Sequence, residues 1–279
     1  MCVIWGIPYL MIRVAVRELA PVTLVLLRTG IAAALLTPVA AARGELRPLL
    51  RHWRPLLAYT AVEVAIPWVL LAQAETTLTS SLTGLLIAAV PLVGAAIVTL
   101  TGERERLGAR RWLGLLVGLL GVAALVGLDV GQVDVVALIE VALVAVGYAT
   151  GPVILSRNLN GAPALGVVAA SLALTAIVYA PFAATHWPAS TPSAHVLESV
   201  AGLAVICTAL AFLVFFALIA EVGPVRATVI TYINPAVAAV LGVTLLDERL
   251  TAGMLVGFCL VLAGCVLATG RSGQPVPEP

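Results

Sequence analysis

Three charged side chains lie inside long apolar stretches of the sequence: Arg28, Glu63 and Glu140. On insertion scales a charge at the centre of a membrane-spanning helix costs about 2.5–3.5 kcal/mol, so such residues often mark ion pathways, proton relays or buried charge pairs. A carboxyl group in this setting can take up a proton or bind a cation, and a guanidinium can bind an anion. Binding and proton exchange are therefore the chemistry that these residue types offer.

Glu63 lies near the middle of the apolar stretch Trp53–Gln73. Tyr59, Thr60 and Pro67 are three or four residues away, so they share one face of the predicted helix with Glu63. Pro67 cannot donate the backbone hydrogen bond that the Glu63 carbonyl would otherwise accept. We therefore expect the side chain and the freed carbonyl to line a cavity at mid-membrane. The alternative is a neutral Glu63 that hydrogen-bonds to a neighbouring helix for packing.

Arg28 and Glu140 lie at the same predicted depth, about 10 Å from the outer ends of their spans on a helical rise of roughly 1.5 Å per residue. Equal depth and opposite charge allow a buried ion pair, although the sequence does not say whether their helices touch. We expect a structural role for Arg28. For Glu140, packing and a role in binding or proton coupling fit the sequence equally well.

Pro91 and Pro235 interrupt predicted spans at corresponding places in the two halves of the chain. Paired interruptions of this kind are the best sequence pointer to the binding site of a transporter, and Tyr232 and Asn234 add polar groups beside Pro235. A plain helix kink is the alternative reading. Three aromatic residues could line the same cavity or anchor the chain at the membrane interfaces: Trp5, Trp68 and Tyr148.

Motifs of soluble enzymes and of ATP-driven machines are absent, with no His-Glu-x-x-His, P-loop or Gly-x-Ser-x-Gly. His52, His186 and His195 fall in or beside predicted connections, and the four cysteines lie in apolar runs without a CxxC pair. Exposed histidines and buried, inert thiols are the expected interpretation. We predict no catalytic residue, no metal site and no cofactor.

Composition decides which class of protein positions these residues. Hydrophobic residues make up 62% of the 279-residue chain and charged residues only 10%, against roughly 25% charged in an average soluble domain. The mean hydropathy is +1.13. So few charges cannot cover a water-soluble fold, and a net charge of +1 offers no basic stripe for nucleic acid. The sequence predicts an all-α integral protein of the cell (inner or plasma) membrane.

Ten membrane-spanning helices are predicted, because a span needs about 20 mostly apolar residues and ten such runs use most of the chain. The predicted spans are Cys2–Val16, Val22–Ala42, Trp53–Gln73, Ser80–Thr101, Arg111–Leu128, Val133–Leu155, Pro163–Ala184, Val196–Ala220, Val225–Leu246 and Ala252–Gly270. The first is short and lacks the basic lead of a signal peptide, which suggests a start placed too late in the gene. The polar, Pro-rich residues 271–279 predict a disordered tail.

The arginines predict the orientation of these spans. With the N-terminus inside, eleven of the fifteen basic residues fall on the cytoplasmic side, three fall outside and one, Arg28, lies within a span. Cytoplasmic connections carry the excess of Arg and Lys in membrane proteins. Both termini are therefore expected in the cytoplasm.

An internal repeat recurs at an offset of 143 residues. Glu105-Arg106-Leu107 matches Glu248-Arg249-Leu250, and Gly114, Gly121 and Gly127 match Gly257, Gly264 and Gly270. Each unit holds five spans, an odd number, so the second unit is expected to be inverted in the membrane. We expect a first repeat at residues 1–131 and a second at 132–270. Gly114-x-x-x-Gly118 and Gly253-x-x-x-Gly257 predict close helix packing, within the protomer or across a homodimer.

An ordered set of short motifs resembles one known family, the EamA-type branch of the drug/metabolite transporter superfamily. The motifs are Trp5-Gly6 with Arg13, Pro21 with Arg28, Thr79-Ser80-Ser81, Pro91, Gly102-Glu103-Arg104, Gly223-Pro224-Val225-Arg226-Ala227, Tyr232-Ile233-Asn234-Pro235, Asp247-Glu248-Arg249-Leu250-Thr251 and Gly257. The chain departs from the family pattern in its short first span and in one extra residue at Glu103–Arg106. The resemblance implies a ten-helix carrier, commonly an exporter, with a central cavity open to one side at a time.

These observations predict a secondary transporter, coupled to protons through Glu63, that exports a small metabolite, amino acid or drug-like organic solute across the bilayer. A mid-membrane carboxyl is hard to ionise, because desolvation disfavours its charged form, so it can hold a proton while occluded and release it to water. Two alternatives stay open: an intramembrane enzyme acting on a lipid-linked substrate, and a structural or sensory membrane protein.

Overall fold

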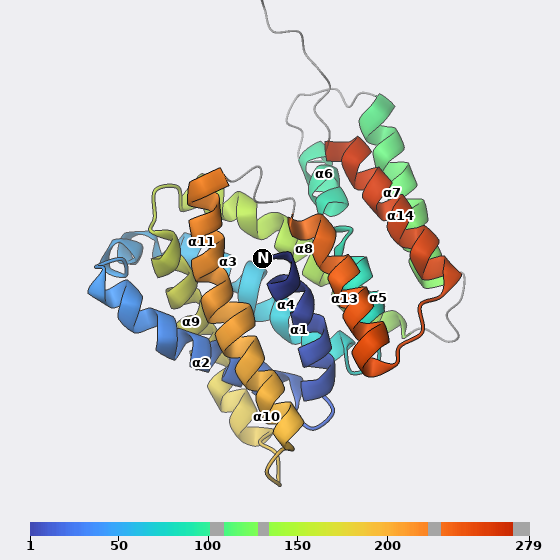
Figure 1. The fold of residues 1–279 in the computed structure, drawn as a ribbon. Helices are drawn as coiled ribbons and strands as arrows, with labels where there is room; N and C mark the ends of the chain where they lie inside the picture. Colours follow the sequence, from blue (N-terminus) through green and yellow to red (C-terminus); the bar gives the residue numbers. More distant parts are fainter. Residues whose placement is uncertain (101–108, 128–133, 223–229, 270–279) are drawn as a thin grey trace, which may run out of the picture.

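The computed structural model describes residues 1–100, 109–127, 134–222 and 230–269, and every regular element in these ranges is a helix (Figure 1). The α-helices are α1 (Cys2–Ala15), α2 (Pro21–Ala42), α3 (Trp53–Tyr59), α4 (Ile66–Ala74), α5 (Ser80–Ile87), α6 (Val90–Leu100), α7 (Ala109–Gly127), α8 (Val135–Asn158), α9 (Ala164–Thr185), α10 (Ala194–Ala201), α11 (Ala211–Val222), α13 (Ile230–Leu246) and α14 (Ala252–Thr269). A 3₁₀ helix, η1 (Arg47–His52), and two π-helices, η2 (Thr60–Ala65) and η3 (Gly202–Leu210), complete the list. The predicted tail, Gly270, and the motifs at 102–107 and 223–227 lie outside the described residues.

Eight helical stretches of the described chain are long and apolar enough to cross a membrane. They are Pro21–Ala42, Arg47–Ala74, Ser80–Ile97, Ala109–Gly127, Val135–Asn158, Ala164–Thr185, Ala194–Ile219 and Ala252–Thr269. Two further apolar helices, α1 and α13, are shorter. The predicted all-α membrane class is confirmed for these residues, and each helical stretch overlaps one predicted span.

Three of the predicted spans are not continuous α-helices. The stretch Trp53–Gln73 is α3, η2 and α4 in succession, and Val196–Ala220 is α10, η3 and α11. Ser80–Thr101 divides into α5 and α6 at a turn over Ala88 and Ala89. A π-helix has i→i+5 hydrogen bonds, which shift the backbone register and occur often at functional sites.

Helix ends follow familiar local rules. Pro21 occupies the first position of α2, where its missing N–H costs nothing. The Thr79 hydroxyl accepts a hydrogen bond from the Leu82 N–H at the start of α5 (3.2 Å), and the Asp134 carboxylate accepts one from Val136 at the start of α8 (2.9 Å). Gly44, just after α2, has a φ of 71°, a left-handed conformation that other residues rarely adopt.

Helices α7 and α14 pack backbone against backbone, side by side at one edge of the molecule (Figure 1). A Cβ placed on Gly121 would lie 2.6 Å from the Val261 nitrogen, and one on Gly257 would lie 2.7 Å from the Gly121 carbonyl oxygen. Gly114 and Gly264 meet in the same way about two turns further along. The close packing predicted from the glycine spacing is therefore confirmed, and it occurs within one chain.

The remaining helices form a bundle beside this pair. Helix α2 packs along α9, α5 along α13, and α4 along α8, while α1 lies between α13 and α10. In Figure 1 the α2–α9 pair and the α7–α14 pair lie on opposite sides of the bundle. Buried apolar clusters fill both parts, and polar side chains gather where α2, η2, α4, α8 and η3 meet.

Candidate functional site

Arg28 is buried at the centre of the bundle, with 8% of its surface exposed. Its guanidinium carbon lies 3.7 Å from the centroid of the Trp68 ring, and its Nε donates a hydrogen bond to the Thr208 hydroxyl at 3.0 Å. A cation stacked on an aromatic face is stabilised by the ring's quadrupole, more strongly when water is excluded. Arg28 thus joins α2 to α4 and to η3.

Glu140 does not pair with Arg28, so the structure does not support the ion pair that equal depth allowed. Arg28 on α2 contacts α4 and η3, whereas α8, which carries Glu140, packs mainly against α4 and α6. Glu140 is partly exposed and has no ion pair among the described residues. Equal depth in the membrane is therefore not enough to bring two residues together, because the packing of the helices decides which residues at one depth meet.

Glu63 lies in the π-helix η2 and packs against α8. Its carboxyl group occupies the space that a side chain at Gly151 would need, and its Oε2 is buried without a hydrogen-bond partner. Tyr59 and Tyr148 lie within electrostatic range of this carboxyl group. Thr60, which the sequence placed on the same helix face, reaches a different neighbour: its hydroxyl donates to the Ser171 hydroxyl of α9 at 2.9 Å.

The backbone around Pro67 is rearranged more than the sequence predicted. Pro67 is the second residue of α4, directly after η2, and its ring packs against Gly147 of α8. A side chain of α9 hydrogen-bonds to this irregular backbone: the Tyr179 hydroxyl donates to the Ala65 carbonyl at 3.0 Å. The loss of regular helix at this level is therefore accompanied by side-chain hydrogen bonds from a neighbouring helix.

The two π-helices occupy corresponding places in the two halves of the chain. Thr60 at the start of η2 plus the offset of 143 gives residue 203, which lies inside η3. Arg28 plus the same offset gives Ser171. At the level of elements, the contact of Arg28 on α2 with η3 thus has a counterpart in the contact of Ser171 on α9 with η2, although the partners Thr208 and Thr60 are not themselves at corresponding positions.

The two proline positions differ from each other in the structure. Pro91 is the second residue of α6 and follows the turn that separates α5 from α6. Pro235 lies inside α13, which is continuous from Ile230 to Leu246. With its amide oriented so that the nitrogen faces two acceptors, Asn234 donates to the carbonyls of Cys2 (3.0 Å) and Ile230 (2.8 Å). Tyr232 packs against the apolar cluster near α14. Asn234 therefore links α13 to α1.

The predicted cavity-lining aromatic residues all belong to packed interior groups. Trp68 is 7% exposed and belongs to one cluster with Tyr148, Phe212 and Phe216. Trp5 of α1 meets the same group from the other side, with its ring centroid 4.7 Å from that of Phe215 and 6.0 Å from that of Phe212. Of these aromatic side chains, Trp68 lies against the Arg28 guanidinium, and Tyr148 lies within electrostatic range of it.

A buried carboxyl group that the sequence reasoning missed lies at the C-cap of α4, directly after Ala74. Glu75 is 0% exposed, and both of its carboxyl oxygens lack a hydrogen-bond partner. Tyr148 lies within electrostatic range of Arg28, Glu63 and Glu75. The run Glu75-Thr76-Thr77 looks like an ordinary polar connection in the sequence, so only its place at the end of an apolar helix could have drawn notice.

Two charged side chains near Glu75, one at the end of a helix and one in a connection, bind the ends of neighbouring helices. Arg13 of α1 donates to the carbonyls of Glu75 and Thr76 (2.9 Å for Thr76). Glu248 accepts four hydrogen bonds at the start of α5, from the backbone N–H and the hydroxyl of both Ser80 and Ser81. A carboxylate is favourable there, because helix N-termini leave N–H groups without partners.

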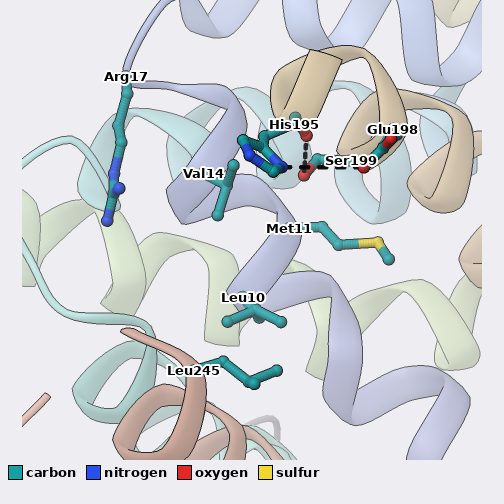
Figure 2. A pocket seen from close by; sticks show the side chains of 8 residues that line it. All are labelled: Leu10, Met11, Val14, Arg17, His195, Glu198, Ser199 and Leu245. Carbon is teal, nitrogen blue, oxygen red and sulfur yellow. Dashed lines mark hydrogen bonds and ion pairs between the residues drawn. The ribbon is translucent and has the colours of Figure 1, made fainter. Parts of the chain in front are cut away.

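A pocket of about 480 Å³ lies outside the central polar group, where α1 faces α10 and the end of α13 (Figure 2). Its lining is Leu10, Met11, Val14, Arg17, His195, Glu198, Ser199 and Leu245. His195 and Glu198 lie 3.9 Å apart and are largely exposed, as the sequence predicted for His195. None of the predicted site residues lines this pocket. The described residues contain no cluster of three or more potential metal ligands.

The family model described as "EamA-like transporter family" matches the chain twice, over residues 1–127 and 136–270. The chain belongs to the EamA-like transporter family. An Escherichia coli relative, "Uncharacterized inner membrane transporter YedA", is 27% identical over 272 residues, which cover 96% of this chain and 87% of that protein in strains K12 and CFT073 alike.

A solved protein, described only as "Crystal structure of protein", has the same fold as this chain. It superimposes with a TM-score of 0.69 and 22% identity, over 96% of this chain and 94% of that one. The resemblance predicted from the short motifs is confirmed by the family match, and the chain is a multi-pass inner-membrane transporter. Several of those motifs have structural explanations: Arg13, Ser80, Ser81 and Glu248 hold helix ends, and Gly6 allows α1 to approach α13.

Proposed function

We propose that this protein is a proton-coupled secondary exporter of a small metabolite, amino acid or drug-like organic solute. The observation that carries the proposal is the central polar group: two paired π-helices, a buried arginine on an aromatic face, and a mid-span carboxyl oxygen without a partner. Polar and ionisable groups inside a membrane protein are costly and usually serve a pathway. Export, rather than import, rests on the family resemblance.

The proposed architecture is ten spanning helices in two inverted repeats, residues 1–131 and 132–270. The two shorter helices, α1 and α13, join the eight longer stretches to make up the ten spans. The two matches of the family model support the duplication. Paired contacts support it further: Thr23 donates to the His186 carbonyl, and its counterpart 143 residues on, Gly166, donates its N–H to Glu45. Five spans per repeat give the second copy the opposite polarity.

The proposed orientation has both termini in the cytoplasm, because eleven arginines then lie inside and three outside. In this orientation Arg13, Glu75, Ser80 and Glu248 lie at the outer ends of their helices. The glycine packing predicted earlier is satisfied within one chain, so the proposal does not require a homodimer.

In the proposed cycle, Glu63 holds a proton and the solute competes for the space around it. The proton leaves Glu63 for water when the central group opens to the less acidic side, and it is replaced from the other side. Trp68, Tyr148 and Trp5 provide the apolar wall, and Arg28 organises it through Trp68 and Thr208. Glu140, Tyr232 and Asn234, which the sequence also offered, lie apart from Arg28 and are left outside this central site.

The test is transport by Glu63→Gln in proteoliposomes. The variant is nearly isosteric and mimics the protonated carboxyl, so it should fold normally and lose solute flux driven by a pH gradient while exchange without a gradient persists. A panel of amino acids and the drug-like cation ethidium would serve as probes. Glu221→Gln, at an exposed carboxylate of α11, is the matched control.

Three results would count against the proposal. Unchanged gradient-driven flux in Glu63→Gln would show that Glu63 does not carry the coupling proton and serves packing instead. Chemical change of a transported probe, detected by mass spectrometry, would favour an intramembrane enzyme. Flux of no probe by the wild-type chain across a broad panel would favour a structural or sensory protein.

A further inference from the structure

Glu75 is the most deeply buried carboxyl group of the described chain that the proposed cycle does not use. It is 0% exposed, and neither carboxyl oxygen has a hydrogen-bond partner among the described residues. Buried polar groups are nearly always paired, and burial of an ionised carboxylate without donors is costly. A group in this state therefore needs an explanation.

The charged and titratable groups around Glu75 come from every element packed against it. They are Tyr9 and Arg13 on α1, Arg28 on α2, Tyr148 on α8, and Glu248 before α14. Both guanidinium groups have partners already, since Arg13 donates to two backbone carbonyls and Arg28 to Thr208. Glu248, an acid, is occupied by Ser80 and Ser81.

We propose that Glu75 is a second proton-binding site, occupied while the outer ends of α1 and α4 are closed as they are here. The proton comes from outer water and converts the carboxylate to the neutral carboxyl group. When the two helix ends separate, water reaches Glu75, the proton returns to that water, and the carboxylate pairs with the Arg13 guanidinium released from the carbonyls of Glu75 and Thr76.

The new site is distinct from Glu63. The two residues lie twelve positions apart on successive parts of one span, a separation of about 18 Å along the axis at a helical rise of 1.5 Å. The inference rests on the proposed function only for which side of the membrane supplies the proton. Protonation of Glu75 itself does not depend on Glu63 or on solute transport.

Infrared difference spectroscopy of the full-length protein in lipid nanodiscs tests this inference, with the spectrum of each variant subtracted from that of the wild type at neutral pH. A protonated carboxyl group gives a separate carbonyl stretching band. At neutral pH this band should be present in the wild type and in Glu221→Gln, and one component should be missing in Glu75→Gln. Glu63→Gln should remove a different component, or none, which separates failure of the Glu63 proposal from failure of this one.

An unchanged band in Glu75→Gln would overturn the inference. If Glu75→Gln does not yield folded protein, Glu75→Asp keeps a carboxyl group and should shift the frequency of the same component. No shift in that variant would overturn the inference equally. The probe in both cases is the proton, so no solute has to be identified.

Discussion

The pair α7–α14 and the central group around Arg28 achieve helix contact in opposite ways. At α7–α14, glycines let two regular helices approach until their backbones touch, with no polar side chain at the contacts around Gly121 and Gly257. At the centre, the helices lose their regularity in η2 and η3, and polar side chains such as Thr60, Ser171 and Thr208 fill the gap between them. Small residues drive close helix contact in lipid, whereas irregular backbone is tolerated only where protein or water surrounds it.

This difference predicts which substitutions should change stability and which should change transport. The glycine contact has no space for a methyl group and contributes to stability. The central group contains unpaired polar atoms that a merely stable bundle would avoid. Substitutions in the first region should therefore change folding, and substitutions in the second should change transport.

The largest effect is expected for Gly121→Ala. Its Cβ would overlap the backbone of α14, so the variant should lose about 1–3 kcal/mol of stability. Gly127→Ala in the same helix is the control, because nothing lies within 4 Å of the new Cβ and alanine favours helix. Thermal unfolding in detergent measures both. Equal midpoints would show that α7 and α14 are not held by this contact.

An intermediate effect is expected for the prolines. Pro91→Ala restores an N–H that can bond the Ile87 carbonyl and join α5 to α6, so gradient-driven flux should fall several-fold while the unfolding midpoint stays the same or rises. Pro235→Ala, in a helix that is already continuous, should change flux much less. Equal loss of flux in both variants would restore the symmetry that the sequence predicted.

The smallest effect is expected for Glu18→Gln. Glu18 binds Ser193, the residue before α10, which is the helix that leads into η3. The Ser193 backbone N–H and hydroxyl donate to Glu18 at 2.7 Å each and hold the pKa of that carboxyl below its ordinary value. A lowered pKa contributes stability that is present above the ordinary carboxyl pKa and is lost as the pH falls through the lowered value. At neutral pH the wild-type protein should therefore unfold at a slightly higher temperature than Glu18→Gln.

The difference between the wild type and Glu18→Gln should vanish in strong acid. Thermal midpoints recorded from pH 7 downward measure it. A difference that is independent of pH would assign the effect to packing rather than to the ionised carboxylate.

Sequence reasoning predicted the helices and the close packing of the glycine faces of α7 and α14, since hydropathy and glycine spacing are local properties that the membrane converts directly into structure. It did not predict that these two helices pack against each other. It did not predict η3, because residues 202–210 contain no proline or charge to signal a changed hydrogen-bond register. Such a register depends on what neighbouring helices offer, here the side chain of Arg28 to Thr208.

Two properties of the central group were beyond the reach of a single sequence. The partner of Arg28 could not be deduced from depth alone, because the order of helices around the bundle decides which residues at one depth meet. Glu75 looked like part of a polar connection, and its complete burial arises from α1, α2 and α8 closing over the end of α4. Both depend on contacts between distant parts of the chain.

The bare backbone contact of α7 with α14 also restricts how the molecule can move. Sliding either helix by one residue would bring leucine or valine side chains against positions that hold only hydrogen atoms, such as Gly121 and Gly257. The register of this pair is consequently locked. Any alternation between inward- and outward-open forms has to preserve this register, so α7 and α14 can only move together, as one rigid unit.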